Sequence, residues 1–589
     1  MSGEHYTAFI KEAFIDPIRS VLIVDDDYPT FDEVLDAQVG ANGGIDVPCR
    51  KGWAKNPARI KNVIARFRDP RHPLVVDIHD GSNVPAGAER AIAAHLNQSD
   101  LLVLDYQLDR SRPNDGTIAF EIIRSLMTND HFNLVVVHTS EALDTVFRNT
   151  LVAMMPAGYC APPDADAKRA AELLEECEDK IEGSYNRIRA SIGEDAYIFA
   201  RGWPQSYSAK VAKSEPPFST FGIECEALQW SVGDRKKVAA YLLAEVEKEM
   251  AFRLNPGQAS GLLWGEEPVK YIMTDSVFVA FSEKGEDCDL IECLLHALKA
   301  SRPLPSHLFL AKLRAAMDKY GVIAQGAVLE TTSALAHWYH RLLSSGGSER
   351  ESLIDDSVVR HSERLMNGIH PHVANFAKRL VEIEAPLASA DDITKAHFGI
   401  DLSKPDAMSR AELEHNALVS TMAPAGWHLT TGHVFAIDND FWVCVSPACD
   451  MVPNQLRDSR SKAFGERLPF MAVRLIKVSK LIGDIHSNRY LFLLIDGRIV
   501  SFCFNEPSDG SSAPVWHTLY AEKRGEFHDG LSFTVSIAEL DGDMLVQRVK
   551  PARVVAQLRY EYALNLVQKL GGSVTRIGLD FVGRREKSS

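Results

Sequence analysis

Four side chains that could do chemistry stand at or just after the ends of short apolar runs: Asp25, Asp26, Asp105 and Thr139. Three carboxylates and a hydroxyl group offer hard oxygen ligands, which Mg²⁺ prefers. One carboxylate of such a group can attack phosphorus while a metal ion neutralises the charge of the phosphoryl group. These residue types therefore predict a metal-assisted reaction with a phosphoryl group, if the chain brings them together.

The apolar runs themselves indicate how the chain could do so. Residues 21–24, 101–104 and 134–137 are unbroken apolar stretches, which is typical of parallel strands that are buried on both faces. The carboxyl ends of such strands meet at one edge of the sheet and form its ligand crevice. We therefore expect the three carboxylates and Thr139 to share one sheet edge.

This arrangement resembles the receiver domain of bacterial response regulators, over roughly the first third of the chain. The segment 23–27 resembles the first-strand signature with its two metal-holding acids, and Leu104-Asp105 resembles the third strand with its phospho-accepting aspartate. Asp115-Gly116 resembles the start of the helix that follows, and the segment 137–140 resembles the fourth strand with its hydroxyl residue.

The resemblance implies a flavodoxin-like, doubly wound parallel sheet with insertions. It implies Mg²⁺ at Asp25, Asp26 and Asp105, phosphorylation of Asp105 by a histidine kinase, and a phosphoryl contact from Thr139.

Two features depart from the family pattern. About eighty residues separate Asp25 from Asp105, so we expect an insertion, placed at residues 40–57. The fifth strand of the family ends in a lysine, and two segments compete for that strand. Residues 158–163 keep the family's proline without a lysine, whereas residues 196–201 read better as a strand and offer Arg201 as the cation.

Composition limits the classes of function. A chain of 589 residues predicts about three domains, and a formal charge of −16 argues against general nucleic-acid binding. Nine cysteines without a Cys-x-x-Cys pair fit reduced thiols in a cytosol. No apolar run reaches the roughly 20 residues of a membrane helix, and the first residues lack a secretion signal. We therefore expect a cytoplasmic protein that does not contact a membrane.

Beyond the first region the patterns predict a multidomain protein of α/β, α and β parts. The expected parts are a receiver-like α/β domain at 16–205, a helical region at 215–400 and an antiparallel β-rich domain at 405–589. Asp496-Gly497 between two apolar runs predicts a hairpin. A helical pattern from Val555 onward predicts a helix that closes this last domain.

A second class of enzyme would use the same first strand differently. Haloacid-dehalogenase-type phosphohydrolases carry Asp-x-Asp, which Asp25 and Asp27 match as nucleophile and acid. Pro29 stands where that family prefers Thr or Val, and Asp105 would have no role. We therefore favour the receiver interpretation, in which the protein accepts a phosphoryl group and is not otherwise an enzyme.

The output of such a receiver has two interpretations. Large receiver proteins without an evident output resemble the phosphate buffer of Detocs, a bacterial anti-phage phosphorelay, in which a second receiver protein carries the effector. The other interpretation is an effector activity in residues 405–589. The one chemically suggestive position there is Cys449, which we expect to be a buried strand thiol rather than a nucleophile.

Overall fold

The computed structural model describes residues 3–30, 33, 57–70, 72–79, 99–109, 111–112, 114–128, 131–158, 162–257, 261–285, 289–329, 332–453, 463–479, 481, 485, 487, 489–495, 497–505 and 514–574. The chain forms two compact units, residues 1–315 and 316–589.

The first unit is built on one seven-stranded sheet, with the order β2-β1-β3-β4-β7-β6-β5. Its strands are β1 (Ser20–Val24), β2 (Val75–His79), β3 (Leu101–Leu104), β4 (Asn133–Thr139), β5 (Leu263–Gly265), β6 (Tyr271–Met273) and β7 (Val277–Glu283). The five strands from β2 to β7 run parallel, and β6 and β5 extend the sheet in antiparallel pairing. The predicted parallel-rich sheet is therefore confirmed.

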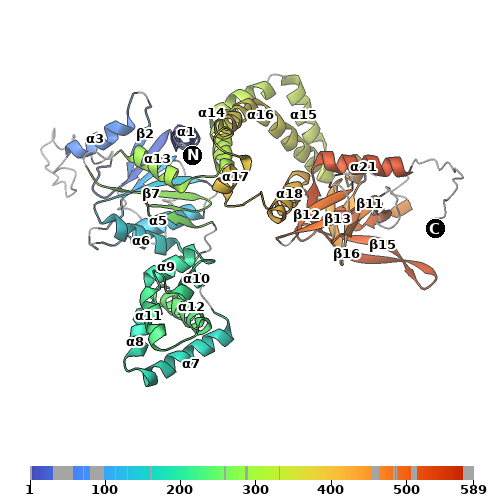
Figure 1. The fold of residues 1–589 in the computed structure, drawn as a ribbon. Helices are drawn as coiled ribbons and strands as arrows, with labels where there is room; N and C mark the ends of the chain where they lie inside the picture. The colour runs from blue at the N-terminus through green and yellow to red at the C-terminus, as the bar shows by residue number, and fades with distance from the viewer. Residues whose placement is uncertain are drawn as a thin grey trace. The chain divides into compact units, whose positions relative to one another are not determined.

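Helices cover both faces of this sheet, which explains why the strands show no alternation of apolar and polar residues. Every residue of β3 and β4 is buried. In Figure 1, α5 (Thr117–Met127) and α6 (Leu143–Met154) lie on one face, and α1 (Gly3–Ile10) and α13 (Leu290–Ser301) lie on the other. Strands that are shielded on both sides gain the most from apolar side chains throughout.

A body of six helices separates α6 from β5 in the sequence. These are α7 (Asp164–Lys180), α8 (Ser184–Ala190), α9 (Glu194–Gly202), α10 (Tyr207–Lys213), α11 (Ser219–Ala227) and α12 (Val232–Glu249). Their buried side chains join those of the sheet in one apolar core. The parallel part of the sheet is thus completed only after this helical insertion, by β7.

Of the two candidates for the fifth strand, residues 196–201 were the wrong choice, because these residues lie in α9. A short apolar run has no period that separates a strand from a buried helix. Here Glu194 and Asp195 in the first turn favour a helix, since acidic side chains stabilise its amino end. The competing segment also forms no strand at Gly158, Pro162 or Pro163, and its residues 159–161 lie outside the described residues.

The expected domain ranges also differ from the observed elements. The range 16–205 stops short of β7, and the range 215–400 contains three strands of the sheet as well as helices. The insertion expected at 40–57 falls outside the described residues except at Pro57, where α3 (Pro57–Phe67) begins. Further helices before residue 400 are α14 (Pro305–Leu329), α15 (Thr332–Ser344), α16 (Gly347–Glu384) and α17 (Ala390–Phe398).

Among the described helices, none combines the length and the apolar character that a bilayer crossing demands.

The second unit contains a closed barrel of six antiparallel strands. They are β9 (His433–Ile437), β10 (Asp440–Cys444), β11 (Leu468–Lys477), β14 (Trp516–Ala521), β15 (Ser532–Asp541) and β16 (Met544–Leu558). The ring closes because β10 pairs with both β9 and β11. Inward side chains such as Phe435, Phe470 and Phe533 fill the barrel. The predicted antiparallel β-rich domain is confirmed.

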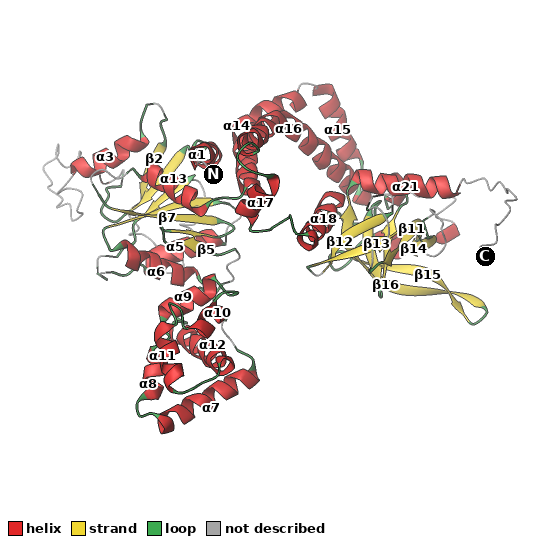
Figure 2. Ribbon diagram, viewed as in Figure 1, coloured by secondary structure: helices red, strands yellow, loops and turns green. Residues whose placement is uncertain are grey.

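Further elements surround the barrel. They are α18 (Pro405–Ser420), β8 (Thr421–Met422), α19 (Ala448–Met451), β12 (Tyr490–Ile495), β13 (Arg498–Cys503) and α21 (Tyr560–Val574). Figure 2 shows α21 lying along the strands, and its buried side chains pack on Val434 and Phe502. The predicted hairpin is present as β12 and β13, with Gly497 at a φ of +74°; Asp496 is outside the described residues.

The closing helix starts later than its pattern suggested. Val555 and Leu558 belong to β16, and α21 begins at Tyr560. Alternate residues of this strand end, such as Val554 and Ala556, are buried. The strand continues to Leu558 because its residues from Arg553 onward still pair with β9 and β8.

Candidate functional site: a carboxylate cluster at one edge of the parallel sheet

The strand register brings the predicted carboxylates to one edge. Val24 of β1 lies opposite Leu104 of β3, so Asp25 and Asp105 leave the sheet side by side. The backbone amide of Asp105 donates to the carbonyl of Val24 at 2.8 Å. Asp25, Asp26 and Asp105 each offer a carboxylate oxygen, and these oxygens lie within 4.8 Å of one another. The sequence predicted that these three acids lie close together, because they stand at the ends of neighbouring strands.

These acids are more buried than ordinary surface carboxylates. Asp25 is 3% exposed and Asp105 is 6% exposed, while Asp26 is half-buried. Thr139, 1% exposed, ends the neighbouring strand β4, and its hydroxyl oxygen accepts from the backbone amide of Glu141 at 3.1 Å. Placing two carboxylates so deep in protein is costly unless a cation lies close by.

That cation is Lys284, the residue directly after β7. Its Nζ lies 2.8 Å from Oδ2 of Asp25 and 2.7 Å from Oδ2 of Asp105, and its side chain is 5% exposed. Its backbone amide donates to the carbonyl of Thr139 at 2.7 Å, which ties the ends of β7 and β4 together. Lys284 thus bridges the two buried acids from a strand far along the chain.

Sequence reasoning missed Lys284 and left the cation open, with Arg201 as the one basic candidate that it named. Arg201 lies on α9, where its Nη1 donates to the carbonyl of Pro156 at 2.9 Å and to the hydroxyl of Tyr197 at 2.6 Å. The signal that could have located the cation is the apolar run of residues 277–281, which is followed at once by Ser-Glu-Lys. That run resembles the other buried strands of the sheet.

The charges of the cluster perturb one another strongly. Burial raises the pKa of Asp105 to about 7, and the negative charge of Asp25 adds to this, although Lys284 opposes it. Burial lowers the pKa of the Lys284 ammonium, but the attraction of Asp25 and Asp105 outweighs this and raises it overall. Lys284 therefore stays protonated, and it compensates only part of the acidic charge around it.

This donor set fits a divalent cation. Three carboxylates against one ammonium leave a formal charge of −2 (one minus three) when all four groups are ionised. Mg²⁺ prefers oxygen ligands and retains several waters, so a few carboxylates at one rim suffice. Within the described residues, no other group of three or more His, Cys, Asp or Glu side chains has this proximity.

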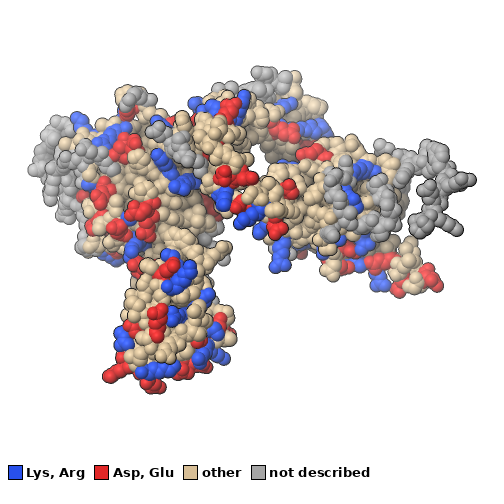
Figure 3. All heavy atoms as spheres, in the orientation of Figure 1, with Lys and Arg blue, Asp and Glu red and all other residues tan. Residues whose placement is uncertain are grey.

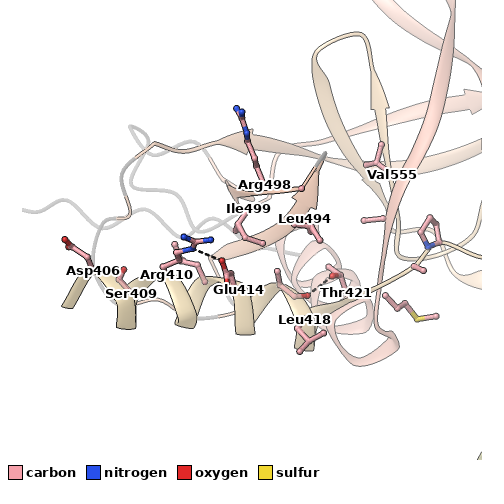
Figure 4. A pocket seen from close by; sticks show the side chains of 17 residues that line it. Asp406, Ser409, Arg410, Glu414, Leu418, Thr421, Leu494, Arg498, Ile499 and Val555 are labelled. Atoms are coloured by element: carbon pink, nitrogen blue, oxygen red, sulfur yellow. Dashed lines mark hydrogen bonds and ion pairs between the residues drawn. The ribbon is translucent and has the colours of Figure 1, made fainter. Parts of the chain in front are cut away.

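The second unit contains a large groove of a different character (Figure 4). It has a volume of about 1090 Å³ and runs between α18 and the β12–β13 hairpin. Leu494 and Ile499 face α18 across it, and on the helix Arg410 pairs with Glu414 at 2.9 Å. Mainly apolar walls with a few polar groups, such as this Arg–Glu pair, are typical of a binding groove.

Cys449 is not the buried strand thiol that was expected. It is exposed and lies in the short helix α19, with its Sγ 3.8 Å from Oδ1 of Asp450. The buried strand cysteine of this segment is Cys444 at the end of β10, and burial raises the pKa of its thiol to about 12. The strand β10 ends at Cys444, and Pro447 is the N-cap of α19, so the strand does not reach Cys449.

On the face drawn in Figure 3, Lys and Arg side chains alternate with Asp and Glu side chains. The described residues on that face form no basic track of the kind that a nucleic-acid backbone requires.

A comparison with known families agrees with the geometry. Residues 17–185 match the family model described as response receiver domain, so the N-terminal part of the chain is a response receiver domain. The match ends before β7 and therefore omits Lys284. No curated protein and no solved structure matched the chain.

Proposed function

We propose that this chain is a phosphorelay signalling protein that accepts a phosphoryl group from a histidine kinase on Asp105. The observation that carries the proposal is the contact of the Lys284 ammonium with both Asp25 and Asp105 at the edge of a receiver sheet. A buried cation that touches the acceptor carboxylate is placed to neutralise the oxygens of an incoming phosphoryl group.

The chemical step follows from these positions. An Oδ atom of ionised Asp105 attacks the phosphorus of a phosphohistidine, the phosphorus–nitrogen bond breaks, and the imidazole leaves with the electron pair. Lys284 opposes the rise in the pKa of Asp105 and so favours its ionised form, and it can donate to a phosphoryl oxygen afterwards. Thr139, at the end of β4, is the proposed hydroxyl contact for the same group.

The proposed metal ligands are Asp25, Asp26 and Asp105, whose excess negative charge supports a Mg²⁺ site. When bound, the ion would neutralise phosphoryl charge. We also propose that the sheet is of the flavodoxin-like, doubly wound type, which the order β2-β1-β3-β4-β7 supports.

The wider role that we propose is that of a cytoplasmic phosphate buffer in a two-component-like anti-phage relay. The chain would drain phosphoryl groups from the kinase without an enzymatic output of its own, and a second receiver protein would carry the effector. The groove beside α18 supports a binding role for the second unit.

The alternative is a phosphohydrolase that uses Asp25 as nucleophile and Asp27 as acid. The contacts of Asp25 argue against it, because Oδ1 accepts from the backbone amide of Asp27 at 2.8 Å and Oδ2 binds Lys284. Both oxygens of the supposed nucleophile are thus held by this chain's own groups.

Phosphorylation by acetyl phosphate with Mg²⁺ tests the proposal. Intact-protein mass spectrometry should find one base-labile phosphate, which Asp105→Asn abolishes. Asp109→Asn is the matched control, because Asp109 lies on the loop after the same strand and contacts Ser111 rather than Lys284. Phosphate that persists in Asp105→Asn and disappears in Asp25→Asn would favour the phosphohydrolase.

A further inference from the structure

Tyr106, the residue directly after the proposed acceptor Asp105, begins a series of hydrogen bonds that leads away from the sheet. Its side chain is 3% exposed, and its hydroxyl oxygen accepts from Nδ2 of Asn149 on α6 at 3.0 Å. The ring is tightly packed, because it meets Phe120 edge-on at 5.8 Å between centroids and a side chain at Gly116 would overlap it. A movement of the backbone at Tyr106 therefore displaces this hydroxyl.

Asn149 connects Tyr106 to the helices α7 to α12, here called the inserted helices. Its Oδ1 accepts from Nη2 of Arg253 at 3.0 Å. Arg253 follows α12, and its Nη1 donates to Oε2 of Glu194, in the first turn of α9, at 2.9 Å. Tyr106, Asn149, Arg253 and Glu194, here called the polar bridge, thus join the residue after the acceptor to the inserted helices.

The polar bridge borders a cavity between α6 and α9, which lie beside each other in Figure 1. The cavity has a volume of about 730 Å³, and Asn149 and Glu194 are among its lining residues. Arg148 of α6 also pairs with Asp195 of α9 there at 2.6 Å, and these two side chains are 46% and 61% exposed. A close-packed interior resists displacement, whereas exposed charged pairs exchange with water at little cost. This side of the α6–α9 contact can therefore rearrange.

A phosphoryl group finds little open space around the acceptor. Asp105 is 6% exposed, and Nζ of Lys284 lies 2.7 Å from its Oδ2. A phosphoryl group adds three oxygen atoms and further negative charge, so its surroundings must move. The hydroxyl of Thr139 accepts from the amide of Glu141, two residues before α6 begins. A Thr139 hydroxyl that is drawn toward the phosphoryl group therefore pulls on the start of α6, the helix that carries Asn149.

A second attachment fixes the main chain on the far side of the polar bridge. Nε of Arg124, on α5, donates to the carbonyl of Ala153 at 2.8 Å. Its Nη2 donates to the carbonyls of Arg253 and Leu254 at 2.8 Å and 3.2 Å. The backbone at Arg253 is therefore held to α5, and only its side chain can follow a movement of Asn149.

We propose that phosphorylation of Asp105 breaks the polar bridge and loosens α9. A displacement of α6 against Tyr106 separates the Asn149 amide from one of its two partners. Arg253 then loses part of its support, and its hold on Glu194 in the first turn of α9 weakens. Helix ends with fewer anchoring contacts open more often. The inserted helices are then the part of the chain that responds to phosphorylation, provided that Asp105 is the acceptor proposed above.

Hydrogen exchange of the full chain with Mg²⁺, with and without beryllofluoride, tests the proposal. Beryllofluoride imitates an aspartyl phosphate. Peptides that cover residues 106–109 report its binding at the acceptor, and peptides that cover residues 194–202 report the opening of α9. In the wild type, beryllofluoride should slow the exchange at the acceptor loop and speed the exchange of α9 about fivefold.

Two variants separate the response of α9 from binding at the acceptor. Tyr106→Phe removes a single hydroxyl group, and Arg253→Gln removes the charge that faces Glu194. Both should keep the slower exchange at the acceptor loop and lose the faster exchange of α9. Arg148→Gln is the matched control, because Arg148 also joins α6 to α9, but through Asp195 rather than through the polar bridge. It should respond like the wild type.

The two sets of peptides keep this inference apart from the proposed function. Slower exchange at the wild-type acceptor loop with unchanged or slower exchange of α9 would overturn the inference and leave the proposed function standing. The polar bridge is not the route if Tyr106→Phe and Arg253→Gln respond like the wild type, or if Arg148→Gln loses the response as they do. A wild-type acceptor loop that ignores beryllofluoride would overturn the proposed function, and the inference with it.

Discussion

One ion-pair cluster of the first unit and one of the second differ sharply in burial. In the first, Lys284 and its partners Asp25 and Asp105 are each less than a tenth exposed. In the second, the Arg548 side chain that links Glu539 and Asp541 is 52% exposed. Exposed pairs contribute about 0–1 kcal/mol, whereas breaking a buried pair leaves an uncompensated charge. The buried group of Lys284, Asp25 and Asp105 therefore has shifted pKa values and forms the candidate site. The exposed pairs of Arg548 only link two neighbouring strands.

The largest expected effect is that of removing the buried cation. Lys284→Met should lower the free energy of unfolding of the first unit by about 3–5 kcal/mol, because Asp25 and Asp105 would then repel each other without compensation. Arg548→Met, the exposed counterpart, should cost about 1 kcal/mol or less. Urea denaturation, followed by hydrogen exchange of β3 and β15 amides, separates the units. Equal costs would remove the distinction between the two pairs.

A smaller effect concerns a buried group that is neutral rather than charged. His433 is fully buried in the barrel unit; its Nδ1 accepts from the backbone amide of Thr430 at 3.1 Å, and its Nε2 lies 3.1 Å from the carbonyl of Ala425. Burial lowers the pKa of His433 to about 4. Protonation would set a donor against the Thr430 amide.

The sign of the pH effect follows from that lowered pKa. The stability that neutral His433 contributes is complete above the unfolded-state pKa of 6.5 and is lost as the pH falls toward about 4. At pH 5 the loss should be about 2 kcal/mol. Hydrogen exchange of the β9 amides measures it, and His433→Gln should flatten the curve between pH 6.5 and 5. Parallel curves for both proteins would rule out His433 as the cause.

The smallest expected effect is that of replacing Cys449, and Cys444 in the same segment is its buried counterpart. Cys449→Ser should change the free energy of unfolding by no more than about 0.5 kcal/mol, because Cys449 is exposed. Cys444→Ser should cost about 1–3 kcal/mol, since it buries a hydroxyl in the barrel wall. A maleimide should label Cys449 and spare Cys444 in the folded chain. Labelling of Cys444 at a similar rate would show that the barrel opens readily.

The sequence alone determined the acids of the candidate site. Residues 21–24 and 101–104 are apolar throughout, and this local pattern predicts strands that are buried on both faces. Parallel strands bring their carboxyl ends to one edge whatever the length of chain between them. Asp25, Asp26 and Asp105 could therefore be grouped without knowing the rest of the fold. The hairpin of β12 and β13 could also be predicted from local sequence, because its turn residues and the apolar runs on either side are adjacent in the chain.

Tertiary structure alone decided which cation completes the site. Residues 196–200 and 277–281 are both short apolar runs, and neither run reveals whether it becomes a helix or a strand. Packing within the inserted helical body made the first run a helix, and pairing with β4 made the second a strand. Likewise, residues 532–537 alternate between polar and apolar types, as a half-buried strand does, but this local pattern does not determine that Leu540 is exposed beyond the barrel. Long-range pairing sets these outcomes, because its free energy depends on partners that no local window contains.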